Sequence, residues 1–103
     1  MGSQTFFHER LAAGKTAEEC FKDAQEEARY DHGHSGYTGT VAEKRKFVMM
    51  PSVEGKETAW DMAMHYINEC DPRVDEKWSP AGCVKGKGSY GYEVYCFFGW
   101  ASC

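Results

Sequence analysis

The sequence lacks the cysteine spacing of a metal site or a disulfide framework. Its five cysteines are an odd number, and no two of them form a C-x-x-C pair. Zinc ribbons need such close pairs, and small secreted disulfide-rich domains usually carry an even number of cysteines. We therefore expect reduced thiols in a reducing compartment, the cytoplasm, and we predict no metal site.

Long apolar runs are also absent. No stretch approaches the roughly 18 continuous apolar residues of a membrane helix. The first ten residues, MGSQTFFHER, lack the apolar core of a secretory signal. We expect a chain that neither enters a membrane nor is exported by that route.

Clustered positive charge is scarce. The chain has 12 Lys and Arg residues against 16 Asp and Glu residues, which gives a formal net charge of -4. The only tight cationic cluster is Lys44-Arg45-Lys46. Binding to the phosphate backbone of nucleic acids usually needs more clustered cations than this. General nucleic-acid binding is therefore disfavoured.

Hydrophobic and aromatic residues are plentiful enough for a packed core. They make up 42% and 15% of the 103 residues. This composition argues against disorder, and the length suits one domain rather than two. We predict a single α+β domain over residues 1–103 that folds without a partner, with less order in residues 1–14.

The clearest predicted element is a helix that begins after Thr16. Thr16 and Glu19 have the spacing of a capping box, in which each side chain accepts a hydrogen bond from the other residue's backbone N–H. Small and apolar residues then recur on one face, and acidic residues stand in the first turn. Gly33 should end this helix near Asp31.

The rest of the chain predicts strand, helix, strand, strand. Residues 40–50 read as one interrupted strand or two short ones, and apolar spacing predicts a helix over 56–70. Residues 81–85 and 92–98 form a predicted hairpin around a glycine-rich turn at 86–91. The last strand is apolar at nearly every position, which is typical of a central strand covered on both faces. The expected fold is two helices on a short, mostly antiparallel three-stranded sheet.

Two glycine motifs resemble phosphate-binding sequences. Gly14-Lys15-Thr16 matches the end of a P-loop, but Glu9 stands where that pattern requires glycine and no convincing strand precedes it. Residues 86–91 match G-x-G-x-x-G, but that motif works only when it joins a strand to a helix, and a strand follows here. We interpret the first as a capped helix start and the second as a hairpin turn, and we predict no cofactor.

The segment 31–40 is the most unusual local feature, because three glycines separate its polar side chains. It could be a structural connection, a small-ligand or nucleotide site in which the protein acts as a sponge, or a hydrolase site with His32 or His34 as general base. The same histidines could bind a metal with His65, Cys83 or Asp31, but two histidines two residues apart are weak evidence. The predicted ligand-binding residues are His32, His34, Ser35, Tyr37, Thr38 and Thr40.

Large aromatic residues exceed what a chain of this length easily buries on one face. Burial in the core is one interpretation of these residues, since aromatic burial commonly stabilises a small domain. The other, which we use for the site prediction, assigns Trp78, Phe98 and Trp100 to an interface with a partner protein or a second copy of the chain. Cysteines Cys20, Cys70 and Cys96 fall at apolar positions and are predicted core residues.

Three segments carry a resemblance to a known group of proteins. They are GHSGYTGTVAEK at 33–44, DEKWSPAG at 75–82 and FFGWAS at 97–102. With the capped helix before them, these segments resemble small uncharacterised bacteriophage proteins, over most of the chain from residue 14. The resemblance implies an accessory protein that binds a host component in the bacterial cytoplasm, and it implies no particular activity. A non-enzymatic binding protein is therefore the leading hypothesis, with the nucleotide and hydrolase hypotheses as alternatives.

Overall fold

The computed structural model describes residues 3–32, 41, 44–75, 78–88 and 90–102. Within them the fold is α+β, as predicted, with two helices and four strands. The elements in chain order are β1 (Ser3–Leu11), α1 (Ala17–His32), β2 (Phe47–Met49), α2 (Ala59–Asn68), β3 (Ala81–Lys87) and β4 (Glu93–Ser102).

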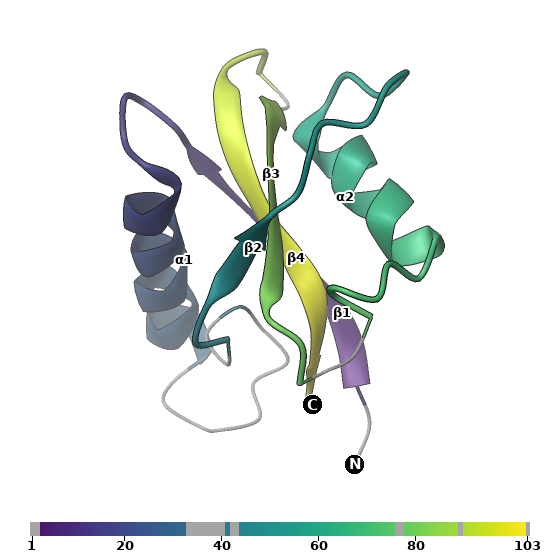
Figure 1. The fold of residues 1–103 in the computed structure, drawn as a ribbon. Coiled ribbons are helices and arrows are strands. Elements are labelled where there is room, and N and C mark those ends of the chain that lie inside the picture. The colour runs from purple at the N-terminus through teal and green to yellow at the C-terminus, as the bar shows by residue number, and fades with distance from the viewer. Residues whose placement is uncertain (1–2, 33–40, 42–43, 76–77, 89, 103) are drawn as a thin grey trace.

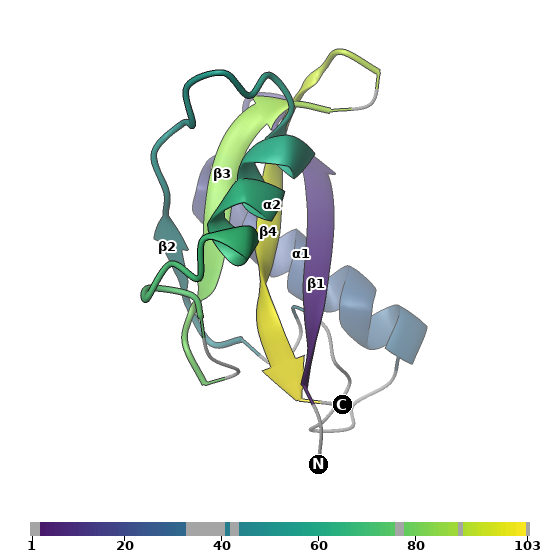
Figure 2. The same ribbon diagram turned by 90° about the vertical axis from the view of Figure 1, so that its right-hand side faces the viewer.

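The strands form one mixed sheet in the order β1-β4-β3-β2. Strand β4 is antiparallel to both of its neighbours, and β2 is parallel to β3. Helices α1 and α2 lie on opposite faces of the sheet (Figure 1). Strands β1 and β2 lie at the two edges of the sheet, with α2 in front of the sheet and α1 behind it (Figure 2).

The prediction of three strands was wrong because β1 was missed. Residues 3–11 were expected to be less ordered, but they pair with β4 from Ser3↔Ser102 to Leu11↔Val94. Phe6 packs in the core under α1, while Phe7 packs on the α2 side. Because both faces of this strand carry an aromatic residue, the segment lacks the apolar-polar alternation by which a strand with one wet face is recognised.

The last strand, β4, is central and covered on both faces, as predicted. Phe97 belongs to the core cluster beneath α1, and its neighbour Phe98 belongs to the cluster beneath α2. Both side chains are fully buried. Phe97 packs against Phe21 with ring centroids 5.3 Å apart, and Phe98 stacks on Tyr66 at 5.9 Å. The two helices therefore supply the cover on both faces.

Helix α1 begins as its sequence predicts. The backbone N–H of Glu19 donates to Thr16 Oγ1 (3.2 Å), and the N–H of Thr16 donates to Glu19 Oε1 (3.1 Å). The helix ends at His32, next to the predicted stop at Gly33. Its buried stripe is Ala17, Cys20, Phe21, Ala24 and Ala28.

Helix α2 is shorter than the predicted 56–70. It begins after Thr58, whose Oγ1 accepts a hydrogen bond from the backbone N–H of Asp61 (3.1 Å). It ends at Asn68, and Cys70 beyond it adopts a positive φ of 53°. Cys70 is exposed, so its assignment to the core was wrong, whereas Cys20 and Cys96 are buried as expected.

Of the predicted strand at 40–50, the described residues form a strand over Phe47–Met49, and residues 40, 42 and 43 lie outside the description. Lys44 is buried, and its Nζ donates to the backbone carbonyl of Ser79 (2.7 Å). The side-chain amide of Gln25 in α1 donates to the carbonyl of Lys44. The Lys44-Arg45-Lys46 sequence is therefore not a surface cluster of three cations, since its first member anchors the segment that enters β2.

Gly82 of β3 lies so close to the Phe98 ring that adding one methyl group at Gly82 should destabilise the fold. A Cβ built on Gly82 would lie 2.4 Å from Cζ of the Phe98 ring. We expect Gly82→Ala to lower the free energy of unfolding by about 1–3 kcal/mol, as overpacking in a core does. Urea unfolding measures this change. The same substitution in a Phe98→Leu background should cost much less, and equal costs in both backgrounds would contradict the clash.

Candidate functional site

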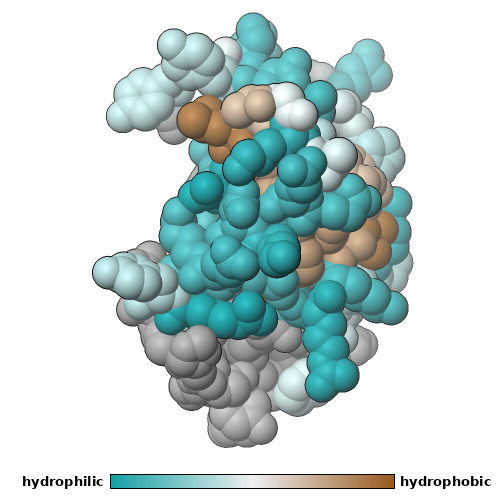
Figure 3. Space-filling view, turned by 90° about the vertical axis from the view of Figure 1, so that its left-hand side faces the viewer, coloured by the Kyte–Doolittle hydropathy of each residue, from teal (hydrophilic) through white to brown (hydrophobic). Residues whose placement is uncertain are grey.

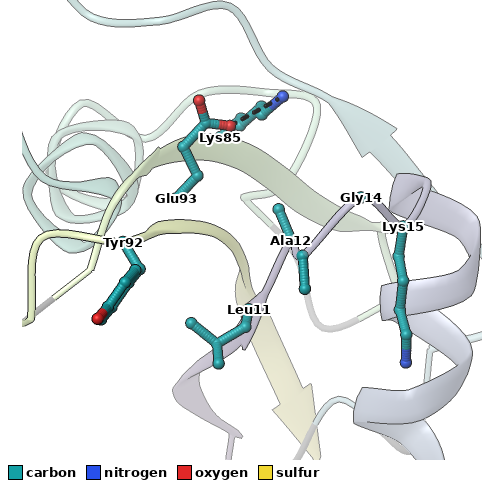
Figure 4. A pocket seen from close by; sticks show the side chains of 8 residues that line it. Leu11, Ala12, Gly14, Lys15, Lys85, Tyr92 and Glu93 are labelled. Atoms are coloured by element: carbon teal, nitrogen blue, oxygen red, sulfur yellow. Dashed lines mark ion pairs between the residues drawn. The ribbon is translucent and has the colours of Figure 1, made fainter.

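Two adjoining cavities open at the end of the sheet where β1 leads into α1 and where the β3–β4 hairpin turns. The larger, about 520 Å³, is lined by residues 11–15, Lys85, Tyr92 and Glu93 (Figure 4). The smaller, about 260 Å³, is lined by Glu9, Leu11, Gly88, Tyr90, Tyr92 and Val94. Both cavities share Leu11 and Tyr92, and we call the pair the sheet-end crevice.

The turn from β1 into α1 forms one wall of the crevice. The N–H of Ala12 donates to the carbonyl of Glu93 (3.0 Å), which extends the β1–β4 pairing beyond Leu11. The chain then bends through positive φ values at Ala13 (44°) and Gly14 (79°). A non-glycine residue at positive φ is uncommon and costs conformational energy. The capping box at Thr16 follows at once, so the wall is held between a strand and a helix.

The β3–β4 hairpin forms the other wall. The N–H of Gly88 donates to the carbonyl of Tyr92 (2.8 Å), and the N–H of Gly91 donates to the carbonyl of Gly88 (3.1 Å). Gly91 has a φ of 83°, which favours glycine. This turn confirms the interpretation of residues 86–91 as a hairpin, and it directs Tyr90 and Tyr92 outward.

Apolar side chains in the crevice are unusually exposed. The exposed fractions are 59% for Leu11, 91% for Tyr90 and 68% for Tyr92. On the α1 side of the molecule the surface is mostly hydrophilic, with one apolar patch at the upper end and a second at mid-height on the right (Figure 3). The sheet-end crevice is therefore an apolar and aromatic hollow on a polar surface.

The lysines of the larger cavity are already paired. Lys85 Nζ lies 3.1 Å from Glu93 Oε2, and Lys15 Nζ lies 2.8 Å from Asp23 Oδ2. The hydrogen bond from Lys15 lowers the pKa of Asp23, and the same bond raises the pKa of Lys15. These pairs leave little uncompensated positive charge for an anionic ligand.

The P-loop-like sequence at residues 14–16 does follow a strand, contrary to our expectation. Its chemistry still differs from that of a phosphate site. The lysine is paired with Asp23, and the carboxylate of Glu19 accepts the hydrogen bond from the N–H of Thr16 at the start of α1. A helix N-terminus binds anions through free N–H groups. In the capping box, the start of α1 binds the carboxylate of Glu19 from the same chain instead of an external anion.

Glu9 is the exception among the charged groups of the crevice. It is half-buried in the smaller cavity, and burial raises the pKa of its carboxyl group above the ordinary 4.5. Within the described part of the chain, the carboxylate of Glu9 makes no hydrogen bond and no ion pair. A desolvated carboxylate without a partner is energetically unfavourable.

The predicted ligand-binding residues His34, Ser35, Tyr37, Thr38 and Thr40 lie outside the described residues. His32 is the last residue of α1, and the placement of its side chain is not described. The nucleotide, hydrolase and metal hypotheses that depend on this segment therefore stay predictions. Among the described residues, no three His, Cys, Asp or Glu side chains gather as a metal site would require.

The three predicted interface residues have different positions. Trp78 is largely exposed, and Trp100 is half-buried. Phe98 was wrongly assigned to a surface, because β4 is central and Phe98 is fully enclosed between the sheet and α2. Trp60, which the sequence analysis did not assign to an interface, is partly exposed and packs on Phe7 with centroids 4.6 Å apart.

Three of the described thiols are sealed in the core. Cys20, Cys83 and Cys96 are buried, and burial raises the pKa of each thiol, that of Cys83 to about 12. A thiol is a poor nucleophile until it ionises. These cysteines therefore act as small apolar core residues.

The crevice was not predicted, because its walls come from opposite ends of the chain. Tyr90 was recognisable locally as part of the predicted glycine-rich turn at 86–91, but nothing in the sequence joined it to Leu11 or Glu9. In the described part of the chain, neither helix is long and apolar enough to span a bilayer.

In comparisons with known proteins, no family model, curated protein or solved structure matches the chain.

The unpaired carboxylate predicts a stabilising substitution. Because burial raises the pKa of Glu9, ionisation of Glu9 costs stability, and this cost appears as the pH rises from 4.5 through the folded-state pKa. We expect Glu9→Gln to raise the free energy of unfolding at pH 7 by about 0.2–0.5 kcal/mol, a small gain because solvent screens the group. The gain should shrink as the pH falls to about 4.

Urea unfolding at both pH values measures the effect. Glu54→Gln, in an exposed turn, removes the same charge and controls for net charge. A Glu9→Gln variant no more stable at pH 7 than the Glu54→Gln variant would contradict the account of Glu9.

Proposed function

We propose that this chain is a binding protein without catalytic activity, which holds a segment of a partner protein in the sheet-end crevice. The observation that carries the proposal is the joint exposure of Leu11, Tyr90 and Tyr92 at one end of the sheet. Apolar area left in water is unfavourable, and tyrosine is enriched at the centres of protein interfaces. A partner segment that covers these side chains would remove that area from water.

The construction of the crevice supports the same proposal. Leu11 is the last residue of a nine-residue strand, and Tyr92 closes a hydrogen-bonded hairpin turn. Anchors on such ordered elements lose little conformational entropy when they bind. The burial of Cys20, Cys83 and Cys96 supports the non-catalytic part of the proposal. The resemblance to small bacteriophage proteins suggests that the partner is a host protein.

A library of unstructured peptides tests this proposal. Peptides selected on the full chain should bind the Leu11→Asn variant at least about tenfold more weakly, since each 1.4 kcal/mol of lost burial is a factor of ten. Met49→Gln is a matched control, because Met49 is 48% exposed on β2, at the other edge of the sheet. Peptides that lose affinity for Met49→Gln but not for Leu11→Asn would refute the crevice as the binding surface.

Self-association is a second proposal, and the free edge of β1 favours it. Strand β1 pairs with β4 alone, so within the described residues its other edge has no strand partner. An edge of nine residues offers a row of backbone N–H and C=O groups to a second copy.

Pairing between two β1 edges predicts a dimer. We expect sedimentation equilibrium at about 0.1–1 mM to show dimers. The N–H of Ala12 donates to β4, so in the unbroken register the N–H of Thr5 faces the free edge, and a proline at Thr5 should abolish the dimers by removing it. Circular dichroism checks that the variant keeps its fold. A monomer throughout this concentration range would exclude pairing at the β1 edge.

A further inference from the structure

We infer that the Glu9 cavity of the sheet-end crevice binds an organic cation, the ammonium or guanidinium head of a basic side chain on the partner segment. This inference rests on the proposed function and adds the chemistry of the partner. It begins from the carboxylate of Glu9, which has no counter-ion among the residues that the structure describes.

The alternation of side chains along β1 isolates Glu9. Its neighbours His8 and Arg10 point to the opposite face of the sheet, where both approach Glu27 of α1. Arg10 forms an ion pair there, and His8 Nε2 lies 3.0 Å from Glu27 Oε1 without the alignment of a hydrogen bond. The nearest cations along the strand are therefore directed away from the Glu9 carboxylate.

The other lysines of the crevice are also engaged. Lys15 pairs with Asp23, and Lys85 pairs with Glu93, both at the larger cavity. Among the described residues that line the smaller cavity there is no Lys, Arg or His. No described cation therefore neutralises the negative charge of Glu9.

The remaining lining of the smaller cavity suits a basic side chain. Tyr90 and Tyr92 present aromatic rings, whose faces attract cations. Leu11 and Val94 supply apolar surface for the methylene stem that carries an ammonium or guanidinium head. The volume of about 260 Å³ lies below the roughly 300–1,000 Å³ of cavities for drug-sized ligands, so it suits one side chain.

The negative charge of Glu9 favours a cation over an anion or an apolar group in the smaller cavity. An anion would be repelled by Glu9, and an apolar group would bury the carboxylate further without neutralising it. A cation pairs with the carboxylate, and the formal net charge of -4 favours its approach from solution.

The test uses the full chain labelled with ¹⁵N and titrated with n-butylguanidinium chloride, against sodium chloride at the same ionic strength. We expect saturable shifts of the backbone amides of residues 9–11 and 90–94, with a dissociation constant in the millimolar range. Glu9→Gln should weaken binding at least about tenfold, and Tyr90→Leu, which keeps an apolar side chain but removes the ring, by about threefold. Glu54→Gln, which removes the same charge from an exposed turn outside the crevice, should leave the affinity within about twofold.

Shifts that do not saturate, or that persist unchanged in Glu9→Gln, would overturn the cation site. The peptide library separates this failure from failure of the proposed function. Selected peptides that depend on Leu11 but carry no Lys or Arg, and that bind Glu9→Gln equally well, would retain the proposed function and overturn the cation site. Butylguanidinium binding that depends on Glu9, without any Leu11-dependent peptide, would retain the site and overturn the proposed function.

Discussion

The requirement to cover β4 on both faces determines most of the fold. Phe97 and Phe98 are consecutive, so their side chains point to opposite sides of the sheet and each needs its own apolar cover. One helix cannot supply both covers. The chain therefore places α1 and α2 on opposite faces, and its path from β1 through α1 to β2 must pass from one edge of the sheet to the other.

The same arrangement produces the sheet-end crevice. Strand β4 runs against both β1 and β3, so β1 and β3 are parallel and end at the same side of the sheet. The turn into α1 and the β3–β4 hairpin therefore meet beyond the strand ends. In this chain the uncovered residues are Leu11, Tyr90 and Tyr92, with Glu9 behind them.

Local chemistry in the sequence predicted local structure well. The Thr16–Glu19 capping box, the end of the first helix and the turn at 86–91 all depend on interactions within a few residues, and the structure confirms them. The errors arose where distant contacts decide. Residues 3–11 form a strand because β4 is available to pair with them, and Phe98 is buried because α2 covers it. The crevice could not be predicted for the same reason, since no local pattern joins Glu9 to Tyr90.

The pairing of β1 with β4 also bears on how the chain reaches its folded state. These strands are the first and last elements along the chain, yet they are neighbours over nine residue pairs, from Ser3↔Ser102 to Leu11↔Val94. During synthesis, β1 must wait for its partner until the segment up to Ser102 has left the ribosome. Helices α1 and α2 also pack against β4, so their tertiary contacts depend on the same strand. The smaller cavity of the sheet-end crevice, which Val94 of β4 and Leu11 of β1 both line, therefore forms only when these two strands have paired.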